Sequence, residues 1–306
     1  MTPSVSVILC AHNPRCDYLG RALEALKPQT LPAAQWEFLL VDNASEKPLA
    51  GQWNLSWHTA ARHIREDTPG LTPARLRGIR ESRGELLVFM DDDNVLAPDY
   101  LEQALKLDAA FPQVAVWSGQ IEPEFEQPPP EWTRIYWHLL ALRTVMRRVW
   151  SNSYVSDTLP IGAGMTVRRT VAELYAKQVV NHKGRAGMGR RGKLLLAGED
   201  SDIGYTALDL GFGCGIAGEL RLTHLIPAAR LQEDYLQNLA RSVTYSHTLL
   251  ALLRGLTQCS PEELFRQRLR SLWYLRVRDG HQRRYLRAVV AGRIAALKEF
   301  CRRQSS

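Results

Sequence analysis

The sequence predicts an α/β fold, with a mostly parallel sheet flanked by helices and a helical C-terminal extension. Short apolar runs typical of buried strands alternate with segments of helical spacing over about the first 120 residues. Asn, Asp, Pro and Gly bound most of these runs, and these residues commonly end strands and form turns. Beyond residue 228 the apolar residues recur mainly at helical spacing. The alternation of strands and helices is typical of a Rossmann-like sheet with helices on both faces.

The individual elements follow from the apolar periodicity of each segment. Strands are predicted at residues 4–10 (SVSVILC), 36–41 (WEFLLV), 58–65, 85–90 (ELLVFM) and 114–121, with further short strands at 211–225. Helices are predicted at residues 19–26, 73–82, 99–110, 132–150, 169–178 and 199–210. The acidic, Pro-rich stretch at 122–131 indicates a loop. Residues 181–193 hold four glycines and five Lys or Arg, which predicts a mobile basic loop.

The composition is that of a globular protein with a basic C-terminal region. Hydrophobic residues make up 45% of the chain and charged residues 23%, enough for a sizeable core. The net charge of +7 is uneven, because residues 254–306 hold 13 Lys or Arg against 4 Asp or Glu. The first 253 residues therefore carry about −2. Basicity confined to one region favours an anionic surface such as a membrane and argues against a nucleic-acid partner.

Cysteine usage and the lack of a long apolar segment predict a cytoplasmic location. The five cysteines are scattered and form no CxxC pair, which indicates neither a zinc site nor a disulfide framework. No run approaches the roughly 20 apolar residues of a membrane-spanning helix. The apolar run at the N-terminus is too short for a signal peptide. The basic tail is compatible with peripheral attachment at the inner face of the membrane.

Carboxylates follow two of the predicted strands. Asp42 comes after the second strand, and Asp91, Asp92 and Asp93 come after the fourth. In open α/β sheets, ligands bind beyond the carboxyl ends of the parallel strands. Three successive carboxylates repel one another unless a cation lies among them, and Mg²⁺ or Mn²⁺ with a substrate diphosphate would supply it. A solvated acidic turn explains the triplet equally well.

Six segments occur in a distinctive order: SVSVILCAHN, FLLVDNAS, GLTPARLRGI, GELLVFMDDDNVL, PIGAGMTVRR and GEDSDIGY. Their order and spacing resemble the inverting family-two glycosyltransferases of the GT-A fold, over roughly residues 4–224. The resemblance implies a GT-A catalytic domain at residues 1–228. Its nucleotide-sugar half would lie at about 1–121 and its acceptor half at about 122–228. Residues 229–306 would form the basic helical extension.

The resemblance implies a donor-binding site at the ends of the first two strands, where the family holds the nucleotide base. The matching residues here are Ala11, His12, Asn13 and Asp42. An Asx turn or a helix cap is the alternative for Asp42, since both are common uses of Asp followed by Asn. Arg75 matches the arginine that contacts the base or the diphosphate, although Leu76 stands where the family usually has Asn. A solvated helix residue is the alternative for Arg75.

Asp91 and Asp93 match the D-x-D motif of the family. The resemblance implies that Asp91 contacts the donor ribose and that Asp93 is the more direct ligand of a divalent cation, Mn²⁺ or Mg²⁺, with Asp92 between them. Asp91 also contributes to this metal site. His224 resembles a histidine that completes the site in some members, but an isolated histidine is as often structural. The cation would neutralise the diphosphate as it departs.

Glu199 and Asp200 match the E-D pair of the family, in which the aspartate is the general base. It takes the proton from the acceptor hydroxyl as that oxygen attacks the anomeric carbon, and the configuration inverts. The alternative is an acidic first helical turn, which the helix dipole favours. A further segment matches the acceptor side, where small residues let a sugar approach the backbone. It consists of Gly162, Ala163, Gly164 and Met165.

These features predict an inverting glycosyltransferase that moves a sugar from a nucleoside diphosphate sugar, with UDP favoured, to a glycan or lipid-linked hydroxyl in polysaccharide synthesis. A sugar-phosphate nucleotidyltransferase is one alternative, but it would need a Gly-rich phosphate loop where this chain has CAHNPRCDYLG. A non-catalytic basic binding module is the other, and it predicts no metal-dependent nucleotide binding. The basic tail has apolar residues at helical spacing, which predicts peripheral contact with an anionic membrane. These residues are Leu286, Val290, Leu297 and Cys301.

Overall fold

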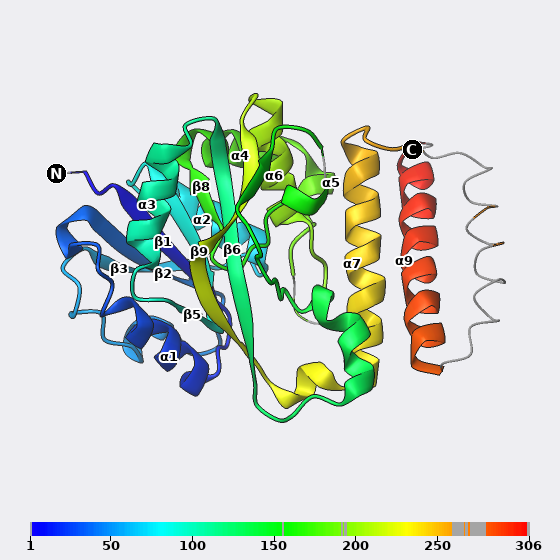
Figure 1. Cartoon of the computed structure of the whole chain (residues 1–306), viewed down its shortest axis with the longest axis horizontal. Coiled ribbons are helices and arrows are strands. Elements are labelled where there is room, and N and C mark those ends of the chain that lie inside the picture. The colour runs from blue at the N-terminus through cyan, green and yellow to red at the C-terminus, as the bar shows by residue number, and fades with distance from the viewer. Residues whose placement is uncertain are drawn as a thin grey trace. The chain divides into compact units, whose positions relative to one another are not determined.

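The chain forms two compact units in the computed structural model, which describes residues 2–154, 156–190, 192, 195–258, 266, 269 and 280–304 (Figure 1). The first unit comprises Met1–Glu124, Ala141–His182 and Asp200–Ile226. The second comprises Phe125–Leu140, Lys183–Glu199 and Pro227–Ser306. The first unit is an α/β fold and the second is mainly helical.

The first unit is built on one sheet, in which the described residues form nine strands. Four neighbouring strands run parallel, in the order β3 (Ala61–Glu66), β2 (Trp36–Asn43), β1 (Val5–Ala11) and β4 (Leu86–Asp91). The order continues with β8 (Thr166–Arg168), β6 (Val114–Phe125), β9 (Gly213–Ile226) and β5 (Asn94–Leu96), and β7 (Val149–Ser151) pairs with β9. The pairs β4–β8, β6–β8, β5–β9 and β7–β9 are antiparallel. The predicted α/β sheet flanked by helices is confirmed.

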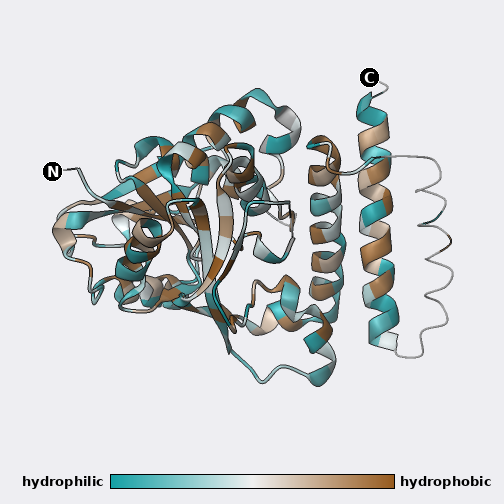
Figure 2. Cartoon of the chain, turned by 45° about the horizontal axis from the view of Figure 1, so that its top comes forward, coloured by the Kyte–Doolittle hydropathy of each residue, from teal (hydrophilic) through white to brown (hydrophobic). Residues whose placement is uncertain are grey.

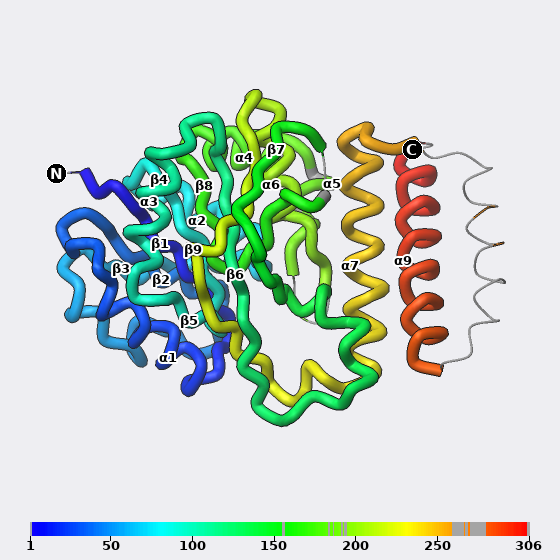
Figure 3. The backbone as a smooth tube through the Cα atoms, in the orientation of Figure 1, coloured from blue at the N-terminus to red at the C-terminus, as the bar shows by residue number. Residues whose placement is uncertain are grey.

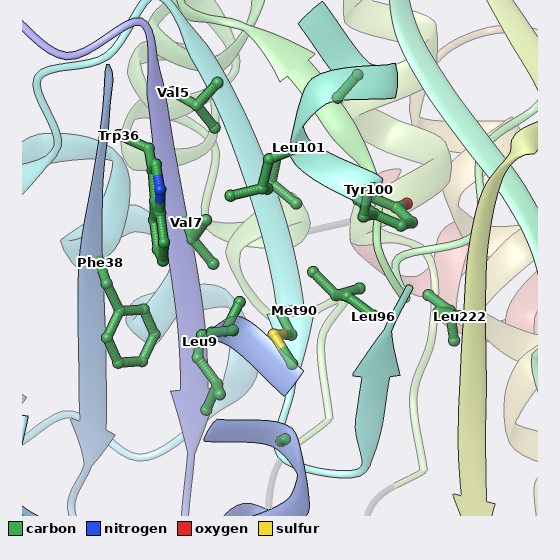
Figure 4. Close-up of a cluster of buried hydrophobic side chains, with 14 of the residues drawn as sticks. Val5, Val7, Leu9, Trp36, Phe38, Met90, Leu96, Tyr100, Leu101 and Leu222 are labelled. Carbon is green, nitrogen blue, oxygen red and sulfur yellow. The ribbon is translucent and has the colours of Figure 1, made fainter. Parts of the chain in front are cut away.

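Helices cover both faces of the parallel strands (Figures 1 and 3). Alternate residues of β1 point to opposite faces, so Val7 and Leu9 belong to one core cluster and Ile8 to the other. The first face packs against α1 (Cys16–Leu26) and α3 (Tyr100–Ala110), as Figure 4 shows in part. The second packs against α2 (Leu71–Glu81), α4 (Arg169–Asn181) and α6 (Glu199–Asp209). Burial on both sides explains why β1, β2 and β4 are mostly apolar runs, whereas the edge strand β3 is not.

The predicted helix at 132–150 is wrong. A 3-10 helix spans Glu131–Leu139, and Ala141 then has a left-handed backbone (φ 57°), a conformation that an α-helix excludes. Arg143 instead forms a backbone bridge to Ile121, with N···O distances of 2.9 and 3.2 Å, so this stretch joins the sheet. The several short strands predicted at 211–225 are a single strand, β9.

In the second unit, α7 (Glu233–Leu253) and α9 (Gly280–Gln304) pack along each other. Their approach is close at Gly292, where a Cβ atom would lie 2.2 Å from the Arg241 carbonyl oxygen. The unit also holds α5 (Lys183–Ala186) and a 3-10 helix at Ala228–Leu231. The other short 3-10 helices of the chain are Ala33–Gln35, Leu49–Gly51 and Ser156–Thr158.

Hydrophobic and hydrophilic residues alternate along the C-terminal helix α9 (Figure 2). Val290 and Leu297, two of the apolar positions of the predicted tail, are buried within the second unit. Much of that tail, residues 259–279 except 266 and 269, lies outside the described residues, as do positions 191 and 193 of the basic loop. Across the described part of the chain, no helix has both the length and the hydropathy that crossing a bilayer requires.

Candidate active site

The predicted carboxylates lie at one edge of the sheet. In the strand register, Asp42 of β2 stands opposite Ala11 of β1, and Asp91 of β4 stands opposite Cys10. These three strands are parallel, so their carboxyl ends meet where ligands of such sheets bind. The structure therefore brings Ala11, Asp42 and Asp91 together within the first unit.

The turn after β1 is joined to the turn after β2 by hydrogen bonds. His12 donates through Nδ1 to the carbonyl oxygen of Asn43 at 2.7 Å, and the Asn13 N–H donates to Ser45 Oγ at 3.0 Å. Asn13 has φ 46°, in the left-handed region that Asn tolerates better than most residues. The side chains of His12 and Asn13 remain exposed, while Ala11 is buried. The two exposed side chains are therefore open to a ligand at this edge.

Asp42 forms the Asx-type turn that the sequence left open as an alternative. Its carboxylate accepts the N–H of Ser45 and the N–H of Leu49, both at 3.0 Å, and Arg65 Nη1 at 2.7 Å. Burial acts to raise the pKa of Asp42, but these hydrogen bonds outweigh it and hold the pKa below its ordinary value of 3.8. Both carboxylate oxygens of Asp42 thus accept hydrogen bonds that hold the turn.

We expect Asp42→Asn to lower the free energy of unfolding by about 2 kcal/mol at neutral pH, because the charge-assisted bonds weaken. The folded-state pKa lies below the unfolded value, so the ionised carboxylate contributes its full stability above pH 3.8. That contribution is lost as the pH falls through the folded-state pKa, so the two proteins should converge in acid. Urea unfolding between pH 3 and 7 measures this. Asp67→Asn is the control, because Asp67 also bonds Arg65 but is 83% exposed. A difference between Asp42→Asn and the wild type that does not change with pH would contradict the expectation.

Asp93 and His224 meet at the end of the turn between β4 and β5. His224 Nε2 lies 3.3 Å from Asp93 Oδ2, and both side chains are less than a tenth exposed. The β5–β9 register places His224 opposite Asn94. Asn94 donates to Asp93 Oδ1 at 2.9 Å and accepts the Asp91 N–H at 3.1 Å, so it fixes this turn. Asp92 lies in the same turn and is partly exposed.

A carboxylate beside an imidazole suits a divalent cation that takes its remaining ligands from phosphates and water. Asp93 and His224 provide this donor set, and Asp91 lies two residues away on the same turn. Three or more His, Cys, Asp or Glu side chains gathered to hold a cation are not found among the described residues. The residues present therefore fit a cation shared with a diphosphate better than one enclosed by protein alone.

Arg75 of α2 is buried beneath the D-x-D turn, with a side chain only 2% exposed. Its Nη2 atom lies 3.5 Å from Asp91 Oδ1 and 3.4 Å from the Gly162 carbonyl oxygen, and the guanidinium packs over the Phe89 ring. This buried guanidinium contacts Asp91, whose side chain is 32% exposed. The contact of Arg75 with the base or the diphosphate stays a prediction.

Asp200 lies in the first turn of α6 and is held by two backbone groups. The Gly162 N–H donates to Asp200 Oδ2 at 3.1 Å, and the Ser201 N–H donates to Oδ1 at 2.7 Å. Gly162 thus contacts both Arg75, through its carbonyl oxygen, and Asp200, through its N–H. Glu199 is 5% exposed and accepts the Gly198 N–H, within the second unit.

The predicted acceptor-side segment, residues 162–165, is buried within the first unit. Ala163 is 3% exposed and Met165 is fully buried, each in a hydrophobic core cluster of the first unit. Gly164 has φ 68° and accepts the Tyr100 hydroxyl, and a Cβ atom there would lie 2.5 Å from Leu222 Cδ2. Close packing therefore accounts for glycine at position 164, and the acceptor-side role of the segment stays a prediction.

Three residues of this region were not singled out from the sequence. Arg65 stands at the end of a predicted strand, and Asp42 was identified by its position at the end of another. Asn94 follows the carboxylate triplet directly, and turn chemistry could have identified it. Arg143 carried no signal, because its segment reads as a helix face.

The chain matches the family model for glycosyl transferase family 2 over residues 6–173, which include the carboxyl ends of the parallel strands and Gly162. It belongs to glycosyl transferase family 2. Membership favours the glycosyltransferase prediction over both the nucleotidyltransferase and the non-catalytic module. It is also in line with the α/β sheet and its carboxylate edge.

Curated relatives of this family 2 member are glycosyltransferases. The chain is 30% identical over 105 residues to the putative glycosyltransferase EpsH of Bacillus subtilis, covering 34% of this chain and 30% of the relative. It is 32% identical over 106 residues to the glycosyltransferase AglE of Haloferax volcanii, covering 34% of each chain. An uncharacterized glycosyltransferase of Haemophilus influenzae is 28% identical over 111 residues, 36% of each chain. The match thus spans about a third of the length of these relatives.

Proposed function

We propose that this family 2 member is an inverting glycosyltransferase that moves a sugar from a nucleoside diphosphate sugar to a hydroxyl acceptor. The observation that carries the proposal is the position of Gly162. Its carbonyl oxygen accepts from Arg75, which supports Asp91, and its N–H donates to Asp200. A donor-side carboxylate and a candidate base are therefore connected through one residue within the first unit. We take residues 1–228 as the catalytic region and 229–306 as its helical extension.

The donor half of the proposal rests on the carboxyl edge of β1, β2 and β4. The exposed His12 and Asn13 face the nucleotide, and the turn that Asp42 holds shapes the pocket for the base. Asp91 binds the ribose, supported from below by Arg75, with Asp92 beside the donor. Asp93 and His224 would hold Mn²⁺ or Mg²⁺, which when bound neutralises charge on the diphosphate. UDP is the favoured nucleotide.

The acceptor half of the proposal rests on Asp200. Its carboxylate takes the proton from the attacking hydroxyl, and the oxygen bonds to the anomeric carbon as the bond to the diphosphate breaks. Attack from the face opposite the leaving group inverts the configuration. Glu199 precedes the base in the same helical turn. The acceptor is a glycan or a lipid-linked oligosaccharide in polysaccharide synthesis.

Thermal unfolding with UDP, GDP and dTDP, each with and without Mn²⁺, tests this function. A ligand that binds only the native state raises the melting temperature, by several degrees when it is at about 100 times its dissociation constant. We expect a rise with UDP that needs Mn²⁺ and disappears with chelator. No rise with any of the three nucleotides in the presence of Mn²⁺ would overturn the proposed donor site.

We also propose that the extension contacts an anionic membrane surface through charge. Val290 and Leu297 are buried in the second unit, whereas Arg287, Lys298 and Arg302 of α9 are exposed. Contact through basic side chains weakens as salt screens it. Flotation with phosphatidylserine vesicles should show binding at low salt that 0.5 M NaCl removes, and no flotation at low salt would refute the contact.

A further inference from the structure

Arg143 is anchored on two sides of the first unit. Its Nη1 donates to Ser118 Oγ at 2.6 Å, and its Nη2 donates to the Leu159 carbonyl oxygen at 3.1 Å. The backbone of Arg143 is itself fixed by the bridge to Ile121. A guanidinium held at both ends in this way has little freedom, and it fixes the chain that carries the Leu159 carbonyl.

The chain from residue 159 to residue 162 connects Arg143 to the candidate base. Leu159 is held by Arg143, and three residues later the Gly162 N–H donates to Asp200 Oδ2. We call residues 159–162 the strap. Because its two ends carry these two bonds, the position of the Asp200 carboxylate depends on the position of the strap.

The strap also packs closely on the helix that carries Asp200. Gly204 is one turn beyond Asp200 on α6, and a Cβ atom there would lie 2.7 Å from Pro160 Cδ and 3.2 Å from Leu159 Cδ2. At the other end, a Cβ atom on Gly162 would lie 2.8 Å from Arg75 Nη2. Glycine at both positions lets the strap lie against the base helix and against the support of Asp91.

We propose that Arg143 is a positioning residue for the general base, holding the strap so that the Asp200 carboxylate faces the attacking hydroxyl. This inference rests on the proposed function, because it assigns a role relative to Asp200. Arg143 touches neither donor nor acceptor in this scheme, so it acts on turnover and not on nucleotide binding.

The charge of Arg143 supports this placement. Burial lowers the pKa of the Arg143 guanidinium, and the Asp200 carboxylate nearby acts in the opposite direction. The guanidinium stays protonated at all working pH values. A fixed positive charge therefore lies near the candidate base in addition to the bonded contacts of the strap.

The test is UDP release from UDP-glucose and UDP-N-acetylglucosamine with Mn²⁺, using water as acceptor, because water needs the same base. We expect Arg143→Gln to lower kcat about 10- to 100-fold, the size that a small misplacement of a catalytic group causes. The donor KM and the UDP–Mn²⁺ dissociation constant from calorimetry should stay within about twofold. Arg143→Lys should recover part of kcat, because it keeps the charge and one of the two bonds.

Controls separate positioning from general damage. Arg147→Gln removes an exposed arginine of the same segment and should leave kcat unchanged. Ser118→Ala removes one anchor of Arg143 and keeps its charge, so we expect a several-fold loss of kcat. This variant still tests the inference if Arg143→Gln does not fold. Gly162→Ala should weaken both kcat and UDP binding, since it displaces Arg75 as well.

Two outcomes would overturn the inference: an unchanged kcat in Arg143→Gln, or a loss of UDP affinity as large as the loss of kcat. Failure of the proposed function looks different. In that case the wild type itself releases no UDP or binds none, or Asp200→Asn is as active as the wild type. An active wild type with an inactive Asp200→Asn and a normal Arg143→Gln would reject the role of Arg143 alone.

Discussion

Asp200→Asn should reduce kcat by roughly 10²- to 10⁴-fold, the usual loss when a general base is removed. The substitution is nearly isosteric, and the new amide oxygen can still accept the Gly162 N–H that bonds Asp200 Oδ2. What is lost is the ability to take a proton from the acceptor. We therefore expect the donor KM and the UDP affinity to stay close to the wild type, whereas the melting temperature should fall slightly, because the amide cannot also accept the Ser201 N–H that bonds Asp200 Oδ1.

UDP release and calorimetry on the same preparations check this expectation. Asp209→Asn is the matched control, since Asp209 is an exposed aspartate at the other end of α6. It should behave like the wild type in both assays. If Asp200→Asn retained more than a tenth of the wild-type kcat, another residue would be the general base. Glu199→Gln would then be the next variant to measure.

Asp93→Asn should abolish the dependence of UDP binding on Mn²⁺ and lower turnover by at least about 100-fold, since a bound cation supplies several kcal/mol of charge stabilisation. His224→Gln should weaken the binding of Mn²⁺ roughly 10- to 100-fold. Its effect on turnover should be smaller than that of Asp93→Asn. Both residues belong to the buried pair at 3.3 Å, so either change removes one of the two proposed ligands.

Manganese titrations of UDP-dependent thermal stability distinguish these variants. Asp99→Asn serves as control, because Asp99 pairs with Arg221 at 3.5 Å and takes no part in the proposed site. Chelator should lower wild-type UDP binding to the level of Asp93→Asn. If Asp93→Asn and His224→Gln keep the wild-type response to Mn²⁺, the cation is bound elsewhere and the pair is structural.

The inner parallel strands β1, β2 and β4 could be predicted because they are buried on both faces. Val7 and Ile8 face different core clusters, so β1 is apolar apart from Ser6, and the polar turn after it marks the sheet edge. The same logic located Asp42 and Asp91. The helix predicted at 132–150 failed because a left-handed Ala141 interrupts it, and periodicity carries no information on that backbone angle.

The connections within the site could not be read from the sequence. Gly162 and Asp200 are 38 residues apart, and Arg75 and Gly162 are 87 apart, so only the fold brings them together. Small residues at 162–165 suggested room for a sugar, whereas at Gly164 they leave room for Tyr100 and Leu222. A glycine that serves packing and one that serves a ligand look alike until their neighbours are known.

The length of β9 has a consequence for how this protein can tolerate insertions and deletions. β9 pairs with β7 near its start and with β5 near its end, where His224 stands opposite Asn94. Successive side chains of a strand point to opposite faces, so a slip of one residue would place Thr223 or Leu225 opposite Asn94. The imidazole would then leave Asp93 while the sheet kept its hydrogen bonds. A length change in this strand would therefore separate the two proposed cation ligands and would also turn Leu220 and Leu222 away from the core that they fill.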